Sequence, residues 1–190
     1  IEPDVDLGVM RPRQTLWELT SALVSALGGL FDGGGFHSVL VQGDTTSALA
    51  GGMCAFYHRI PVGHVEAGLR SHKRYSPFPE EMNRVLLGRL ATWHFAPTDY
   101  SASLLRTENT APESIFVCGN TVVDALQWMV RNLEDRPLPN GAADGSRRLV
   151  LVTCHRRENH GLPIRSVALA IHHMAGSRDD VHFLFPLHPS

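Results

Sequence analysis

Two short apolar runs, each followed by an acidic residue, constrain most strongly how this chain folds. Residues 39–42 lead to Asp44, and residues 62–65 lead to Glu66. The segment between them, residues 45–58, is rich in Ala, Leu, Met and Phe and predicts a helix. A strand, a helix and a second strand form one βαβ unit, in which the strands run parallel and the crossover is right-handed. Both acids are therefore expected at the carboxyl ends of parallel strands, where open α/β sheets bind their ligands.

The same alternation continues along the chain and predicts an α/β fold with doubly wound parallel sheets. Helices are expected at residues 14–30, 45–58, 80–90, 100–108, 121–133 and 164–175. Strands are expected at residues 39–42, 62–65, 93–96, 115–118, 149–153 and 181–185. Residues 135–148 are rich in proline, glycine and charge, which is typical of a linker.

This linker divides the chain into two expected domains. Residues 1–134 would form most of a first Rossmann-like domain that lacks its first strand and loop, and residues 149–190 would begin a truncated second one. The chain begins with Ile1 and stops just after a predicted strand. We therefore expect an internal piece of a longer protein.

Composition excludes several classes of partner. The formal net charge of the 190 residues is −2, which argues against nucleic acid or an anionic membrane as the main partner. No apolar run approaches the roughly 20 residues that a membrane span needs. The cysteines Cys54, Cys118 and Cys154 form no CxxC pair, so we expect reduced packing residues in a cytoplasmic protein and no metal site.

Three carboxylates are candidates for acid–base chemistry on a bound small molecule, and each has a structural alternative. Asp44 precedes a predicted helix and could serve only as its N-cap. Glu66 ends a strand, where a purely structural acid is less common. Glu80 follows Pro79 at a helix start, where acids also suit the helix dipole. Arg84 lies one turn after Glu80 and is expected to orient its carboxylate.

A basic turn provides the second candidate group. His155, Arg156 and Arg157 lie between a predicted strand and a predicted helix, a position that suits a phosphate. The alternative is a solvated basic turn without a ligand. His155, Glu158 and His160 do not form a convincing metal site, because nothing places them on one helical face.

Five motifs together resemble one known family. The strings are QGDTTSALAGG, IPVGHVEAGLRS, YSPFPEEMNR, CGNTVVDAL and VTCHRREN, and they resemble the non-hydrolysing UDP-N-acetylglucosamine 2-epimerases in order and separation. The resemblance implies two Rossmann-like domains facing a deep cleft (the glycosyltransferase-B arrangement), a homodimer, and a nucleotide sugar as the ligand. It implies that Asp44, Glu66, Glu80 and His155 take part in catalysis or substrate binding. From their positions we expect Arg156 or Arg157 to support His155 at the UDP phosphates, and Arg84 to support Glu80.

The implied reaction is the interconversion of UDP-GlcNAc and UDP-ManNAc. The C2 hydrogen of the sugar is not adjacent to a carbonyl group, so elimination of UDP with formation of a C1=C2 double bond offers a better route than simple deprotonation. Such a route needs carboxyl groups on both faces of C2 and a cation near the departing phosphate. It needs no cofactor, and the sequence contains no GxGxxG motif.

Three alternatives remain open from the sequence. The protein could be a 2-epimerase of a modified UDP-acetamido sugar, with residues 69–78 deciding the preference. It could be a hydrolysing relative that releases UDP and free ManNAc. From another class, it could be a glycosyltransferase or a nucleotide-sugar-binding module that keeps the fold without epimerising.

Overall fold

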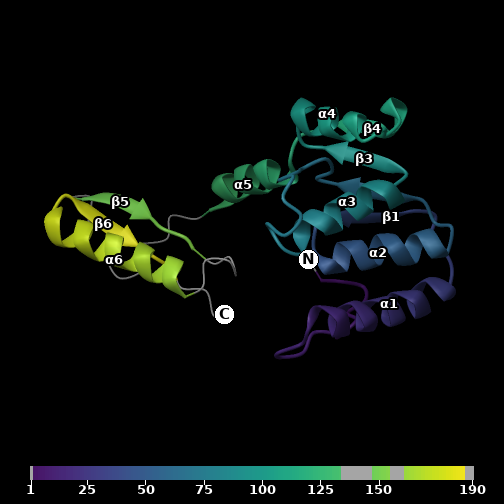
Figure 1. Ribbon diagram of the computed structural model, residues 1–190, viewed down its shortest axis with the longest axis horizontal. Helices are drawn as coiled ribbons and strands as arrows, with labels where there is room; N and C mark the ends of the chain where they lie inside the picture. The colour runs from purple at the N-terminus through teal and green to yellow at the C-terminus, as the bar shows by residue number, and fades with distance from the viewer. Residues whose placement is uncertain (1, 134–146, 155–160, 187–190) are drawn as a thin grey trace. The chain divides into compact units, whose positions relative to one another are not determined.

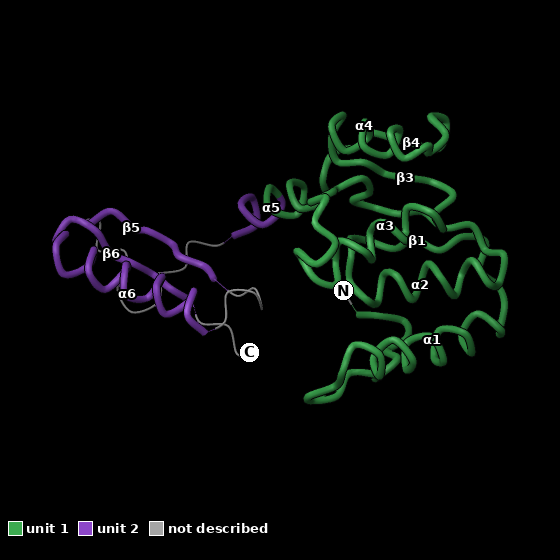
Figure 2. The backbone as a smooth tube through the Cα atoms, viewed as in Figure 1, with its two compact units in different colours: residues 1–127 green, residues 128–190 purple. Residues whose placement is uncertain are grey.

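The computed structural model describes residues 2–133, 147–154 and 161–186. The chain divides into two compact units, residues 1–127 and residues 128–190 (Figure 2). The division falls inside helix α5 (Thr121–Asn132), and each unit contains its own parallel sheet. The expected α/β class with parallel sheets is confirmed.

The first unit is built on a four-stranded parallel sheet with strand order β1-β2-β3-β4 (Figure 1). Its strands are β1 (Val39–Gln42), β2 (Val62–Val65), β3 (Trp93–Ala96) and β4 (Ile115–Val117). Its helices are α1 (Leu16–Asp32), α2 (Thr46–Tyr57), α3 (Glu80–Leu90), α4 (Asp99–Thr107) and the start of α5, and a 3₁₀ turn, Pro112–Ser114, precedes β4. Because all strands are parallel, their carboxyl ends lie along one edge of the sheet.

Threonine side chains begin three of these helices. Thr15 forms a capping box with Glu18 at α1, in which each side chain bonds the backbone of the other residue. Thr45 caps α2 by accepting the N–H of Ala48 at 3.2 Å, and Thr98 caps α4 in the same way. The helix starts are therefore fixed by local sequence.

A core of apolar side chains joins helices α1 to α3 to the sheet. Its buried members are Phe31, Val41, Ala48, Cys54, Ala55, Val62 and Leu87. Helices α2 and α3 approach closely at Gly52, where an added Cβ would lie 2.6 Å from Leu87 Cδ2. A second, smaller cluster packs α4 against the ends of β2 and β3 and consists of Ala67, Ala96, Ala102 and Leu105. The close packing of the two clusters holds the helices of this unit against the sheet.

The second unit contains one βαβ element. Strands β5 (Arg148–Leu151) and β6 (Val181–Leu184) pair in parallel, and α6 (Leu162–Ser177) lies between them in sequence. Asp180 receives hydrogen bonds from Arg148 and Arg178 at the start of this pair. Arg148 was expected in the linker but already belongs to β5, since its N–H bonds the Asp180 carbonyl at 2.8 Å. Residues 134–146 of the expected linker lie outside the described residues.

No helix in the described part of the chain is both long enough and apolar enough to cross a membrane. Cys54, Cys118 and Cys154 are all free thiols, and the expectation that they are packing residues is wrong for Cys118, which is exposed.

Candidate functional site

The sheet brings Asp44 and Glu66 to the same edge, as the βαβ pattern predicts. Strand β1 pairs with β2 through Gln42 and Val65, and the next amide, Gly43 N–H, bonds the Val65 carbonyl at 3.0 Å. An added Cβ on Gly43 would lie 3.6 Å from Glu66 Oε2. The Glu66 carboxylate therefore lies against the backbone of the residue that precedes Asp44.

Glu66 has an unusual backbone conformation. Its φ of 68° is in the left-handed region, which residues with a Cβ seldom adopt. Such conformations cost free energy and occur disproportionately at functional sites. The neighbouring strand supports this turn, because the next amide, Ala67 N–H, bonds the Phe95 carbonyl at 3.0 Å.

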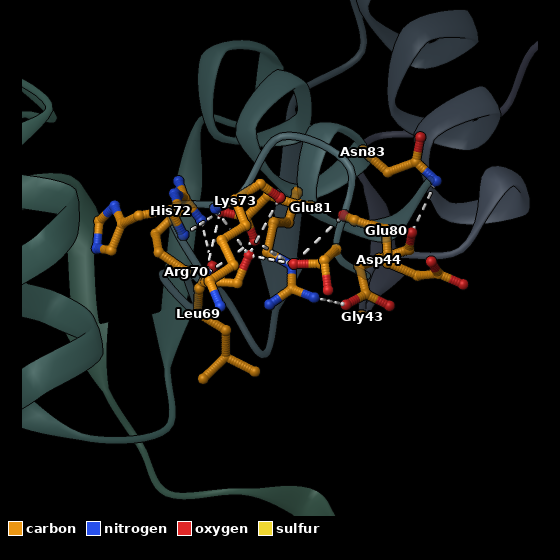
Figure 3. Close-up of polar contacts among 12 residues, drawn as sticks. Gly43, Asp44, Leu69, Arg70, His72, Lys73, Glu80, Glu81 and Asn83 are labelled. Atoms are coloured by element: carbon orange, nitrogen blue, oxygen red, sulfur yellow. Dashed lines mark hydrogen bonds and ion pairs between the residues drawn. The ribbon is translucent and has the colours of Figure 1, made fainter. Parts of the chain in front are cut away.

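Helix α3 holds Asp44 through two side chains (Figure 3). Arg84 Nη2 lies 2.7 Å from Asp44 Oδ2, and Asn83 Nδ2 donates to the Asp44 backbone carbonyl at 2.8 Å. The Arg84 side chain is 11% exposed and that of Asp44 is 30% exposed. Because Thr45 caps α2, the alternative that Asp44 serves only as the N-cap is wrong.

The expected partner of Arg84 was the Glu80 carboxylate, and this expectation is wrong. Arg84 Nε lies 3.4 Å from the Glu80 backbone carbonyl, while its charged partners are Asp44 and Glu81. Helical side chains point back toward the helix N-terminus, so Arg84 reaches over the first turn to the end of β1. Glu80 begins α3 and is partly buried.

Glu81, which the sequence analysis does not select as a site residue, anchors the loop before α3. The residue is 3% exposed, and its carboxylate accepts the N–H of Ser71 at 3.0 Å and of His72 at 2.9 Å (Figure 3). Burial raises the pKa of Glu81, but the hydrogen bonds from Ser71 and His72 and the charge of Arg84 outweigh burial, so the net pKa is lowered. Arg84 and Glu81 thus connect this loop to Asp44.

A buried ion pair holds the same loop from its other side. Arg70 donates to both carboxylate oxygens of Glu108, with distances of 2.7 and 2.8 Å, and the Arg70 side chain is 1% exposed. The hydrogen bonds from Arg70 lower the pKa of Glu108. Residues 70–72 are therefore fixed by α3 and by the end of α4.

Two buried histidines lie side by side on the neighbouring strands β2 and β3. His64 pairs in register with His94, and a His64 Nε2 hydrogen bond to the Gly43 carbonyl measures 2.8 Å. Burial lowers the pKa of His64, and burial together with His64 lowers the pKa of His94 to about 4. Both imidazoles are therefore neutral near pH 7, and His64 supports the turn that carries Asp44.

Asn120 completes the group around Glu66. Its Nδ2 donates to Glu66 Oε1 at 3.0 Å from the turn between β4 and α5. Asn120 belongs to the CGNTVVDAL motif but was not selected as a site residue, because nothing in its local sequence indicates a partner 54 positions away.

The basic turn remains an expectation from sequence. His155, Arg156 and Arg157 lie outside the described residues. Within the described ranges, no group of three or more His, Cys, Asp and Glu side chains is arranged to hold a metal ion.

The described arrangement can exchange protons with a bound polar ligand. Asp44 and Glu66 are partly exposed carboxylates at one sheet edge, and Glu80 begins the helix that holds Asp44. Partly exposed carboxylates at a sheet edge can accept or deliver protons to a substrate atom within hydrogen-bond reach.

Comparisons with known proteins place the chain in one family. The family model described as UDP-N-acetylglucosamine 2-epimerase matches residues 1–190. The Bacillus subtilis UDP-N-acetylglucosamine 2-epimerase is 47% identical over 188 residues, which cover 99% of this chain and 49% of that protein. The Escherichia coli K12 enzyme of the same name is 43% identical, over 99% of this chain and 52% of its own length.

Solved structures give the same result. The Neisseria meningitidis UDP-GlcNAc 2-epimerase bound to UDP-GlcNAc superposes with a TM-score of 0.92 and 40% identity, covering 100% of this chain and 53% of that one. A UDP complex from S. aureus gives a TM-score of 0.91 and 41% identity, covering 100% of this chain and 50% of that one. The chain spans about half the length of these relatives, and it belongs to the UDP-N-acetylglucosamine 2-epimerase family.

Proposed function

We propose that the full-length protein interconverts UDP-GlcNAc and UDP-ManNAc by exchanging the proton at C2. The observation that carries this proposal is the family match over residues 1–190, combined with Asp44 and Glu66 at one sheet edge. The relatives solved with UDP-GlcNAc or UDP support a nucleotide sugar as the ligand.

The proposed reaction balances without an external oxidant or reductant. In the first half, a carboxylate takes the C2 proton while the C1–O bond breaks and its electron pair leaves with UDP. This step yields UDP and a sugar with a C1=C2 double bond. In the second half, a carboxylic acid delivers a proton to the opposite face of C2 as a phosphate oxygen of UDP bonds C1 again.

The proposed roles follow from position and charge. Asp44, Glu66 and Glu80 serve as the acid and base groups around C2 and the glycosidic oxygen. Arg84 keeps the Asp44 carboxylate in place through their 2.7 Å ion pair. The sequence and the family resemblance support phosphate contacts by His155, Arg156 and Arg157.

The remaining proposals concern the oligomeric state, the location and the domain bounds of the protein. The family resemblance supports a homodimer, with a first Rossmann-like domain at residues 1–134 and a second that begins with β5 at Arg148. The three cysteines, which form no CxxC pair, support a cytoplasmic protein. Light scattering on the full-length protein tests the dimer, and a monomeric mass at micromolar concentration would contradict it.

Proton NMR of the full-length protein with UDP-GlcNAc in deuterated water tests the activity. The expected products are a mixture with UDP-ManNAc and deuterium at C2 of both sugar nucleotides. Epimerised product that keeps its original C2 hydrogen would exclude the elimination route.

The alternatives give different spectra in the same experiment. Free ManNAc with UDP would identify a hydrolysing enzyme. An unchanged spectrum would favour a modified UDP-acetamido sugar as substrate, or a glycosyltransferase or binding module.

A further inference from the structure

Asn120 uses both ends of its side-chain amide. Nδ2 donates to Glu66 Oε1 at 3.0 Å, and Oδ1 accepts the N–H of Val122 at 3.0 Å. The second bond is a helix cap, since Val122 lies in the first turn of α5. The residue before Asn120, Gly119, has a φ of 82°, which turns the chain from β4 into the helix.

The cap determines which end of the amide faces Glu66. Amide oxygen and nitrogen are assigned from their hydrogen-bond partners. The Val122 N–H can bond only to an acceptor, so Oδ1 lies at the helix and the NH₂ group faces the carboxylate. A flipped amide would lose both bonds.

The two carboxylate oxygens of Glu66 are therefore unequal. Oε1 is held by Asn120, whereas Oε2 lies against Gly43, next to Asp44. Asn120 is neutral, so it orients Glu66 without adding a charge to the site. By contrast, Asp44 is held by the cation of Arg84.

We propose that Asn120 is a positioning residue that fixes Glu66 through Oε1 and leaves Oε2 to exchange the substrate proton. This inference rests on the proposed function. It differs from a purely structural role, in which Asn120 would only cap α5.

Two substitutions separate positioning from capping, because Asp, Ser and Asn cap helices about equally well. Asn120→Ser keeps a cap but loses the donor to Glu66, and we expect kcat to fall about tenfold with KM within about twofold. Asn120→Asp keeps the cap but places a second carboxylate against Glu66, and we expect a loss of about 10² in kcat. Asn109→Asp makes the same chemical change at an exposed turn and should retain wild-type kcat.

The diagnostic result is a larger loss of kcat in Asn120→Asp than in Asn120→Ser. A capping role alone predicts that activity follows stability, with both variants near wild type. Near-normal kcat in Asn120→Asp, in a wild-type protein that converts UDP-GlcNAc, would overturn the proposal.

A thermal measurement tests the contact even if the proposed activity fails. In the wild-type background, Asn120→Asp should lower the melting temperature by a few degrees at pH 8, because two carboxylates meet. In the Glu66→Gln background, the same substitution should cause no decrease, because the amide introduced in place of the Glu66 carboxylate can donate to the new acid. Equal decreases in both backgrounds would show that residues 66 and 120 are not coupled, and would overturn the proposal.

Discussion

Arg84 and Asp44 form an ion pair across 40 positions of sequence, with Nη2 and Oδ2 2.7 Å apart. The same guanidinium has Nε 3.6 Å from Glu81 Oε2, and Glu81 in turn binds the amides of residues 71 and 72. One side chain of α3 therefore ties the end of β1 to the loop that leads into the helix. Asp44 cannot shift independently of that loop.

Arg84→Lys should lower kcat about 10²-fold while the protein still folds. Lysine carries one compact ammonium group and cannot present Nε and Nη2 to two carboxylates at once. Steady-state kinetics with UDP-GlcNAc measure the effect. Arg106→Lys is the matched control, because Arg106 is exposed in the last turn of α4. Equal losses in the two variants would contradict a specific role for Arg84.

Neutral amides at Asp44, Glu66 or Glu80 should each lower turnover by about 10² or more, as for lost acid–base groups. Circular dichroism should stay at the wild-type signal, because these residues lie at strand ends or a helix start outside the apolar core. The rate of deuterium incorporation at C2 measures the effect directly. Glu113→Gln, an exposed acid before β4, is the control. A near-normal rate of deuterium incorporation in Glu66→Gln would show that Glu66 is not an acid–base residue of this reaction.

Local sequence was sufficient to predict most of the fold. The strands at residues 39–42, 62–65 and 93–96 and the helix at 80–90 have the expected bounds. Apolar periodicity is a local signal, so it is readable without tertiary information. Parallel βαβ order then placed Asp44 and Glu66 at one edge before any contact was known.

The partners of the site residues could not be predicted in the same way. Arg84 has carboxylates at Asp44, Glu80 and Glu81 within reach, and only the packing of α3 against α2 and β2 selects among them. Asn120 meets Glu66 because β4 follows β3 in the sheet, which places its end beside the same edge. Such pairings depend on strand order and helix packing, which local patterns do not encode.

Glu108→Gln should destabilise the full-length protein by about 2 kcal/mol at pH 7, because it leaves the buried Arg70 guanidinium without its charged partner. Arg70 lowers the pKa of Glu108 in the folded state, so this stabilisation is present above the ordinary value of 4.5 and is lost as the pH falls through the folded value. Denaturant unfolding at several pH values should show the wild-type advantage shrinking below pH 4.5. A difference between the two proteins that is constant from pH 7 to pH 3 would contradict the ion pair.

The buried histidines should make the protein less stable in mild acid. The folded-state pKa of His94 is about 4 against an ordinary 6.5, so the unfolded state binds a proton more readily than the folded state between these values. Stability should therefore decrease as the pH falls from 6.5 to about 4, by an amount on the order of 3 kcal/mol. His64, opposite His94, adds to the same trend.

His94→Asn should flatten this pH dependence, whatever its effect on stability at pH 7. Urea unfolding between pH 7 and pH 4 measures the slope for each protein. His37→Asn removes an exposed histidine and controls for the number of histidines. An unchanged slope in His94→Asn would exclude His94 as its source.

Gly68→Ala should prevent folding or cost more than about 3 kcal/mol, because it combines strain with a backbone clash. Gly68 has a φ of 86°, and an added Cβ would lie 2.3 Å from the Ser101 carbonyl oxygen in α4. Neither atom belongs to a flexible side-chain end, so β2 and α4 would have to separate just after Glu66. Gly28→Ala makes the same change in α1, where nothing lies within 4 Å, and should stabilise by about 0.5 to 1 kcal/mol. Soluble yield and thermal unfolding compare the two variants, and a melting temperature of Gly68→Ala equal to that of wild type would contradict the close packing of α4 on this turn.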